Sequence, residues 1–146
     1  MDKALLDAAV IACRSLITTR FPDSSEHGAA AMVLGDGTIV TGTSPRVDNN
    51  SVALCHETEP YCAAFRLGQP VAASVCLHRD VRQRVIVLSP CGLCRERLSV
   101  YGPAVLAAVP SVDDSTEIVW KQLSDLLPDA WMTAFPQDYQ AWGRDR

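Results

Sequence analysis

Two short stretches decide how this chain is interpreted: Cys55-His56-Glu57 and Pro90-Cys91-Gly92-Leu93-Cys94. Cysteine thiolates are ligands for zinc, and a catalytic zinc site keeps three protein ligands and leaves a fourth position open for water. The stretches supply three cysteines and one carboxylate that could act as an acid and base. We therefore expect Cys55, Cys91 and Cys94 to bind a metal, with Glu57 beside it as the catalytic residue.

Other interpretations of the same residues exist. A Cys-x-x-Cys pair alone is typical of a redox pair or of half of a structural zinc site. A closed site that adds His56 as a fourth ligand would leave Glu57 as a solvated helix residue, but adjacent residues on a helix point in different directions.

Together, the Cys-x-Glu and Pro-Cys-x-x-Cys stretches resemble the signature of the zinc-dependent cytidine deaminase superfamily. The resemblance covers most of the chain, including segments 28–30, 41–42, 89–95 and 126–128. It implies an α/β fold with three layers, α/β/α, around a mixed central sheet, and it implies Zn²⁺ as the cofactor. It also implies that Glu57 moves protons while the 4-amino group of a small cytosine compound is replaced by a carbonyl and ammonia leaves.

The residues expected to bind substrate depart from this family. Ser44 and Arg46 stand where the family usually carries the Asn and Glu that hold the ribose hydroxyls. An arginine favours a substrate with a carboxylate or phosphate, because its planar fork pairs with either anion; a solvated loop arginine is the alternative. His56 replaces the usual Ala, and we include it with Ser44 and Arg46 as a substrate-binding candidate. Thr58 replaces an Arg that usually lies near the thiolates.

The expected substrate is therefore cytidine, deoxycytidine or a relative. Blasticidin S or another modified or anionic cytosine compound is the alternative, because blasticidin S deaminases also change the ribose-binding Glu. A zinc-stabilised binding module without catalysis is an alternative of another class. The family's substrate-stacking Phe has no clear counterpart, and Phe21-Pro22 is a displaced candidate.

Hydrophobic spacing predicts the elements of the fold. A helix is expected at 3–18, a hairpin at 28–34 and 38–43, a loop at 44–54, a helix at 57–67, strands at 72–77 and 85–88, a helix at 91–100, a strand at 104–109 and a short helix near 120–127. This order favours a mixed sheet covered by helices.

Composition sets further expectations. With 146 residues, 48% of them hydrophobic, the chain is expected to form one domain over 1–146. A formal net charge of −4 argues against nucleic acid as a partner, and no segment suggests a membrane partner or a signal peptide. The six cysteines fit a reducing cytoplasm.

The family resemblance implies a homotetramer as well as a small-molecule substrate. The aromatic residues near the C-terminus, Trp131, Phe135, Tyr139 and Trp142, either cap the domain's own core or help to close a neighbour's site.

Overall fold

A mixed sheet of six strands forms the middle layer of the computed structural model, which describes residues 1–22 and 26–135. The strands are β1 (His27–Leu34), β2 (Ile39–Gly42), β3 (Val71–Arg79), β4 (Val85–Leu88), β5 (Leu106–Pro110) and β6 (Ile118–Gln122). Their order is β2-β1-β3-β5-β6, with β4 also paired to β3, and among the strand pairs of the described residues only β3–β5 is parallel.

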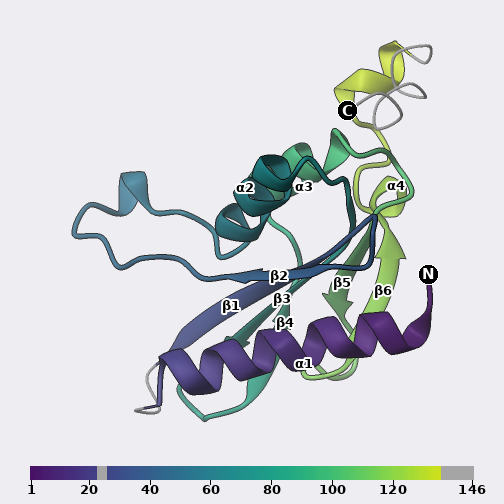
Figure 1. The fold of residues 1–146 in the computed structure, drawn as a ribbon. Coiled ribbons are helices and arrows are strands. Elements are labelled where there is room, and N and C mark those ends of the chain that lie inside the picture. Colours follow the sequence, from purple (N-terminus) through teal and green to yellow (C-terminus); the bar gives the residue numbers. More distant parts are fainter. Residues whose placement is uncertain (23–25, 136–146) are drawn as a thin grey trace.

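Helices cover both faces of this sheet (Figure 1). The helix α1 (Lys3–Arg20) covers one face, and α2 (Thr58–Leu67) and α3 (Gly92–Ser99) lie on the other. The short helix α4 (Leu123–Leu126) follows β6, and single 3₁₀ turns occur at Asn50–Val52 and Trp131–Ala134. The three-layer α/β/α prediction is confirmed. None of the helices in the described part of the chain could span a membrane.

Each face of the sheet carries its own apolar core. The face toward α1 buries the helix stripe Leu6, Ala9, Cys13 and Ile17, which has the spacing of an amphipathic helix, against small and β-branched side chains of β1 and β3. The opposite core contains Met32, Leu34, Ala64, Val71, Leu98, Val105 and Leu123. Because the central strands β1 and β5 are buried on both faces, their sequences are nearly continuous hydrophobic runs.

One edge of β3 is divided between two partners. Its C-terminal half pairs with β4, ending at Cys76 opposite Leu88, and its N-terminal half pairs with β5, where Ser74 lies opposite Ala107. After Leu88 the edge is already occupied by β5, so the chain must leave the sheet. It does so through the buried Pro90, which has no N–H to pair, and α3 begins two residues later.

The prediction for the last helix is wrong over its first residues. Ile118–Gln122 is strand β6, paired antiparallel with β5, and only Leu123–Leu126 is helical. The unpaired edge of β5 provides backbone hydrogen-bond partners along the β-branched and aromatic segment Ile118–Gln122, and this pairing outweighs the helical spacing of the segment. Of the aromatic tail, Trp131 donates a hydrogen bond to Glu96 on α3 at 3.0 Å; positions 139 and 142 lie outside the described residues.

Candidate metal centre and substrate cavity

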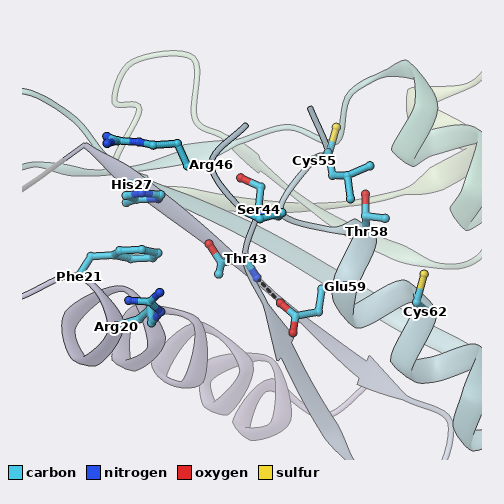
Figure 2. Close-up of a pocket in the computed structure, with 12 residues that line it drawn as sticks. Arg20, Phe21, His27, Thr43, Ser44, Arg46, Cys55, Thr58, Glu59 and Cys62 are labelled. Carbon is cyan, nitrogen blue, oxygen red and sulfur yellow. Dashed lines mark hydrogen bonds between the residues drawn. The ribbon is translucent and has the colours of Figure 1, made fainter. Parts of the chain in front are cut away.

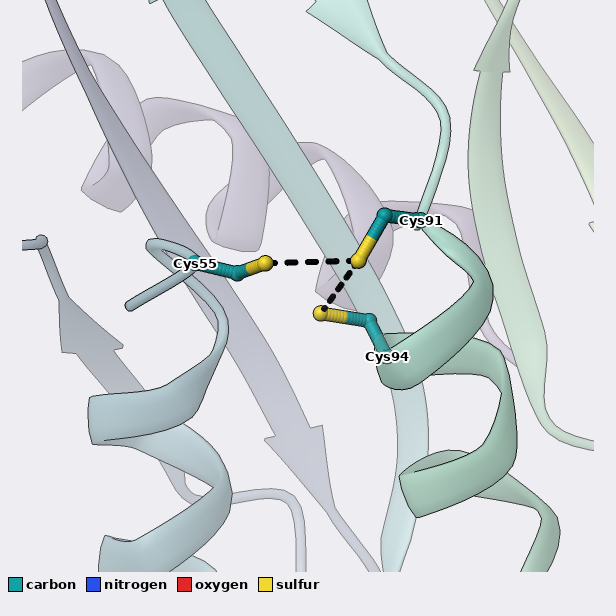
Figure 3. A group of neighbouring side chains, drawn as sticks. All are labelled: Cys55, Cys91 and Cys94. Atoms are coloured by element: carbon teal, nitrogen blue, oxygen red, sulfur yellow. Dashed lines mark hydrogen bonds between the residues drawn. The ribbon is translucent and has the colours of Figure 1, made fainter. Parts of the chain in front are cut away.

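The three candidate metal ligands converge from two helices. Cys55 lies just before α2, Cys91 caps α3, and Cys94 follows in the first turn of α3 (Figure 3). The Sγ atom of Cys91 is 3.3 Å from that of Cys55 and 3.6 Å from that of Cys94, and all three sulfurs lie within 4.8 Å of one another. A tetrahedral zinc ion with Zn–S bonds of about 2.3 Å separates its sulfurs by about 3.8 Å. The donor set and its spacing therefore fit zinc.

The start of α3 favours a thiolate at Cys91. Burial acts to raise the pKa of this thiol, but hydrogen bonds from the backbone N–H groups of Cys94 and Leu93 bring the pKa below its ordinary value. Burial raises the pKa of Cys55 and of Cys94, and the charge of Glu57 adds to both increases. A bound cation would hold these two cysteines as thiolates, which the protein environment alone disfavours.

Glu57 is a buried carboxylate beside this cluster. It is only 4% exposed, and its Oε1 accepts a hydrogen bond of 2.6 Å from the hydroxyl of Ser74, at the point where β3 changes partner. Burial raises the pKa of Glu57, while the Ser74 hydrogen bond opposes that increase. Glu57 does not belong to the group of mutually close ligand atoms. Its position and raised pKa suit proton transfer.

His56 turns away from the sulfurs. Its Nδ1 accepts a hydrogen bond from the backbone N–H of Ser44 at 3.1 Å and lies 3.0 Å from the Ser44 hydroxyl. Burial, followed by the charges of His78 and His27, lowers the pKa of His56 to about 4, so the ring is neutral with Nδ1 as acceptor. Among the described residues the group that could hold a metal contains only cysteines, so the four-ligand alternative with His56 finds no support.

The ring of His56 rests on Gly28. A Cβ atom at Gly28 would lie 2.4 Å from Nε2 of His56 and 2.8 Å from the carbonyl oxygen of Leu77. Only a glycine allows this approach, so the small residue in β1 fixes how closely the start of α2 sits on the sheet. At Gly92, by contrast, an added Cβ would meet nothing within 4 Å.

A cation from α3 reaches the start of α2. The guanidinium of Arg97 donates a hydrogen bond of 2.8 Å to the hydroxyl of Thr58. Arg97 also lines a narrow internal gap together with Glu57 and Cys94, and its charge acts to lower the pKa of Glu57. Arg97 therefore places a positive charge beside Thr58, which itself replaces the arginine usual in the family. Sequence reasoning missed Arg97 because the two residues meet only through space.

A cavity of about 550 Å³ opens beside Cys55 (Figure 2). The expected substrate-binding residues Ser44 and Arg46 line it, whereas His56 reaches it only through Ser44. Its wall further includes Arg20, Phe21, His27, Thr43, Pro45, Leu54, Thr58, Glu59 and Cys62. Of these, the sequence had singled out Phe21, as the displaced candidate for a stacking aromatic residue, and Thr58, as the replacement for an Arg near the thiolates. The size is that of ordinary small-molecule sites.

Comparisons with known proteins agree with this geometry. No protein-family model matches the chain. A cytidine deaminase of Mycobacterium tuberculosis is 35% identical over 105 residues, which cover 71% of each chain. A blasticidin-S deaminase of Bacillus cereus is 26% identical over 117 residues, covering 77% of this chain and 81% of that protein. The crystal structure of the cytidine deaminase from Bacillus anthracis superposes with a TM-score of 0.87 at 34% identity, over 94% of this chain and 97% of that one. The chain therefore belongs to the cytidine deaminase family.

Proposed function

We propose that this member of the cytidine deaminase family holds Zn²⁺ at Cys55, Cys91 and Cys94 and uses Glu57 to deaminate a small cytosine compound. Family membership makes the chain a hydrolytic deaminase of cytosine compounds. The reaction adds one water at C4 of the ring and releases one ammonia, which leaves a carbonyl. The observation that carries the proposal is the convergence of three sulfurs within 4.8 Å of one another, next to a buried carboxylate.

The environment of Glu57 supports its role in moving protons. A carboxylate whose pKa is raised by burial holds a proton more readily than an ordinary one, which suits a group that must both accept and return a proton. Ser74 holds one carboxylate oxygen through its 2.6 Å hydrogen bond, which fixes the orientation of the group. In this role Glu57 takes a proton from the attacking water, gives one to the ring nitrogen and passes another to the departing amine. When bound, zinc supplies the Lewis acidity that lowers the pKa of water from 15.7 toward about 7.

The metal ligands and the cavity are arranged for this chemistry. Cys55 belongs to both the sulfur cluster and the wall of the cavity, so a ring bound there would lie next to the metal. Three protein ligands leave one position open, as a catalytic zinc site requires. A structural zinc site would close all four positions, and the described residues offer no fourth ligand.

The decisive experiment measures zinc per chain together with loss of the cytosine absorbance on cytosine, cytidine, deoxycytidine, their monophosphates and blasticidin S. We expect one zinc per chain, turnover of at least one of these compounds, and loss of turnover in Glu57→Gln with zinc retained. Glu117→Gln, which removes an exposed carboxylate in the loop before β6, is the matched control and should keep full activity. Unchanged turnover in Glu57→Gln would refute the role of Glu57. One bound zinc with no turnover of any compound would favour the binding module.

We also propose a cytoplasmic homotetramer. Exposed apolar side chains near the site, including Phe65 on α2 at 78% and Leu93 on α3 at 67% exposure, supply surface that subunit contacts would cover. All six cysteines are free thiols, which suits a reducing compartment. Light scattering of the purified protein tests the tetramer: a monomeric mass at micromolar concentration would contradict it.

A further inference from the structure

One wall of the cavity is a stack of rings between two guanidinium groups. The rings of Phe21 and His27 lie parallel, with an interplanar angle of 2° and centroids 3.6 Å apart. The guanidinium of Arg20 lies 5.3 Å from the centroid of Phe21. Figure 2 shows Arg20, Phe21, His27 and Arg46 following one another along this wall, with Arg46 on the far side of His27. The four residues come from the end of α1, the start of β1 and the loop after β2.

Among the residues that the structure describes, the two arginines of this wall have no ion-pair partner. In the described part of the chain the ion pairs are Lys3–Asp7 and Arg84–Asp80, and neither Arg20 nor Arg46 takes part in one. The carboxylate of Glu59 also lines the cavity, but it accepts the backbone N–H of Thr43 at 2.8 Å and lies on the α2 side (Figure 2).

The surroundings of His27 report the same excess of positive charge. Burial lowers the pKa of His27, and the charges of Arg46, His78, Arg20 and Arg79 lower it further. Unpaired cations that gather at a cavity repel one another and raise the local concentration of anions.

Two hydroxyl groups of the wall are already engaged within the protein. The hydroxyl of Thr43 donates to the carbonyl oxygen of Gly28 at 2.6 Å, and the hydroxyl of Ser44 lies 3.0 Å from Nδ1 of His56. These groups are thus directed into the protein and not toward a sugar. The guanidinium groups of Arg20 and Arg46 are the strongest donors left for a ligand at this wall.

We propose that Arg46 and Arg20 form an anion-binding subsite, which receives a carboxylate or phosphate group carried by the cytosine compound beyond its ring. The inference rests on the proposed function, because the ring must reach the metal beside Cys55 while the anion reaches the arginines. The subsite would favour an acidic cytosine compound as substrate. An uncharged nucleoside would leave both guanidinium groups without an anion. Phe21 and His27 provide the flat surface between the two arginines.

Calorimetric titration of the zinc-loaded Glu57→Gln variant, which should bind ligand without turning it over, tests the subsite. The probes are cytidine, cytidine 5′-monophosphate and the nucleoside whose 5′ carbon is a carboxylate. We expect at least one anionic probe to bind tenfold or more tightly than cytidine, because a hydrogen bond between arginine and an anion commonly increases affinity by about that factor. The preference should fall below twofold when Arg46→Gln is added and should weaken with Arg20→Gln. Lys121→Gln, which removes one charge on β6 at the opposite edge of the sheet, should retain it.

The outcomes separate the two proposals. Tighter binding of only the phosphate or only the carboxylate supports the subsite and identifies its anion. If the wild-type enzyme turns over cytidine, but the anionic probes bind no more tightly than cytidine or Arg46→Gln keeps their advantage, the subsite is wrong and the deaminase stands. If no probe binds, and the wild-type enzyme turns over neither these probes nor cytosine, deoxycytidine, its monophosphate or blasticidin S, both proposals fail.

Discussion

The contact between Gly28 and His56 allows a quantitative test of how the site is positioned. In Gly28→Ala the new methyl group would lie 2.4 Å and 2.6 Å from two atoms of the imidazole and 2.8 Å from the carbonyl oxygen of Leu77. Carbon contacts normally fall near 3.5 Å, so the ring must move by about 1 Å. The carbonyl of Leu77 cannot follow easily, because β3 pairs with β1 beside it. Overpacking of this kind costs about 1–3 kcal/mol, and we expect the upper half of that range.

Urea unfolding of the metal-free protein measures this loss of stability, and zinc titration measures its effect on the neighbouring Cys55. His56→Ala removes the two ring contacts, so the double variant should be about 1–2 kcal/mol more stable than the sum of the single effects predicts. Gly92→Ala is the control, since its methyl group meets nothing within 4 Å, and it should leave stability unchanged or slightly increased. A Gly28→Ala variant within about 0.5 kcal/mol of the wild type, or strictly additive effects in the double variant, would refute the reasoning.

Three further results are expected. Burial lowers the folded-state pKa of His56 to about 4, below its unfolded value of 6.5, so the unfolded chain takes up the proton first as the pH falls. After allowance for screening at this half-buried ring, the free energy of unfolding of the metal-free protein should fall by about 1–2 kcal/mol between pH 6.5 and 4. In His56→Asn this dependence of stability on pH should be weaker. Arg97→Gln should weaken zinc binding about tenfold in a chelator competition, as the loss of groups that surround metal ligands commonly does. The control Arg66→Gln, at the end of α2, should bind zinc as the wild type does. If Arg97→Gln and the wild type bind zinc equally well, the charge of Arg97 does not influence the thiolates. Removal of zinc should make one additional thiol react quickly with a thiol reagent, that of Cys91, because this residue is exposed and its pKa is lowered. A labelling time course of the metal-free protein measures this reaction. The same time course in Cys91→Ser would contradict the prediction.

The sequence was sufficient for the parts of the fold that depend on local patterns. The stripe of α1, the tight turn before β2 and the left-handed Gly68 that ends α2 all follow from spacing and backbone preference. The strand β6 did not, because its pairing depends on the free edge of β5, which no local pattern reveals.

The same distinction holds at the site. The cysteines and Glu57 could be proposed from two short motifs, since ligand spacing along the chain carries the information. Arg97 meets Thr58 across two helices, and the stacked wall joins residues from both sides of the 23–25 segment to the loop that carries Arg46. Such contacts arise from packing in three dimensions, so a single sequence contains little trace of them.

The divided edge of β3 implies that the two segments leading to the candidate metal ligands, one between β4 and α3 and one between β2 and Cys55, differ in how freely they can change in evolution. Only Ser89 and Pro90 separate β4 from the Cys91 cap of α3, and β5 occupies the edge beyond β4, so an insertion there would displace the two candidate metal ligands Cys91 and Cys94 together. The segment 43–54 between β2 and Cys55 is long and mostly exposed, and it carries five of the twelve residues that line the cavity, Ser44 and Arg46 among them. A lineage could thus exchange or lengthen this segment, and acquire a new substrate, while the reaction itself stayed the same.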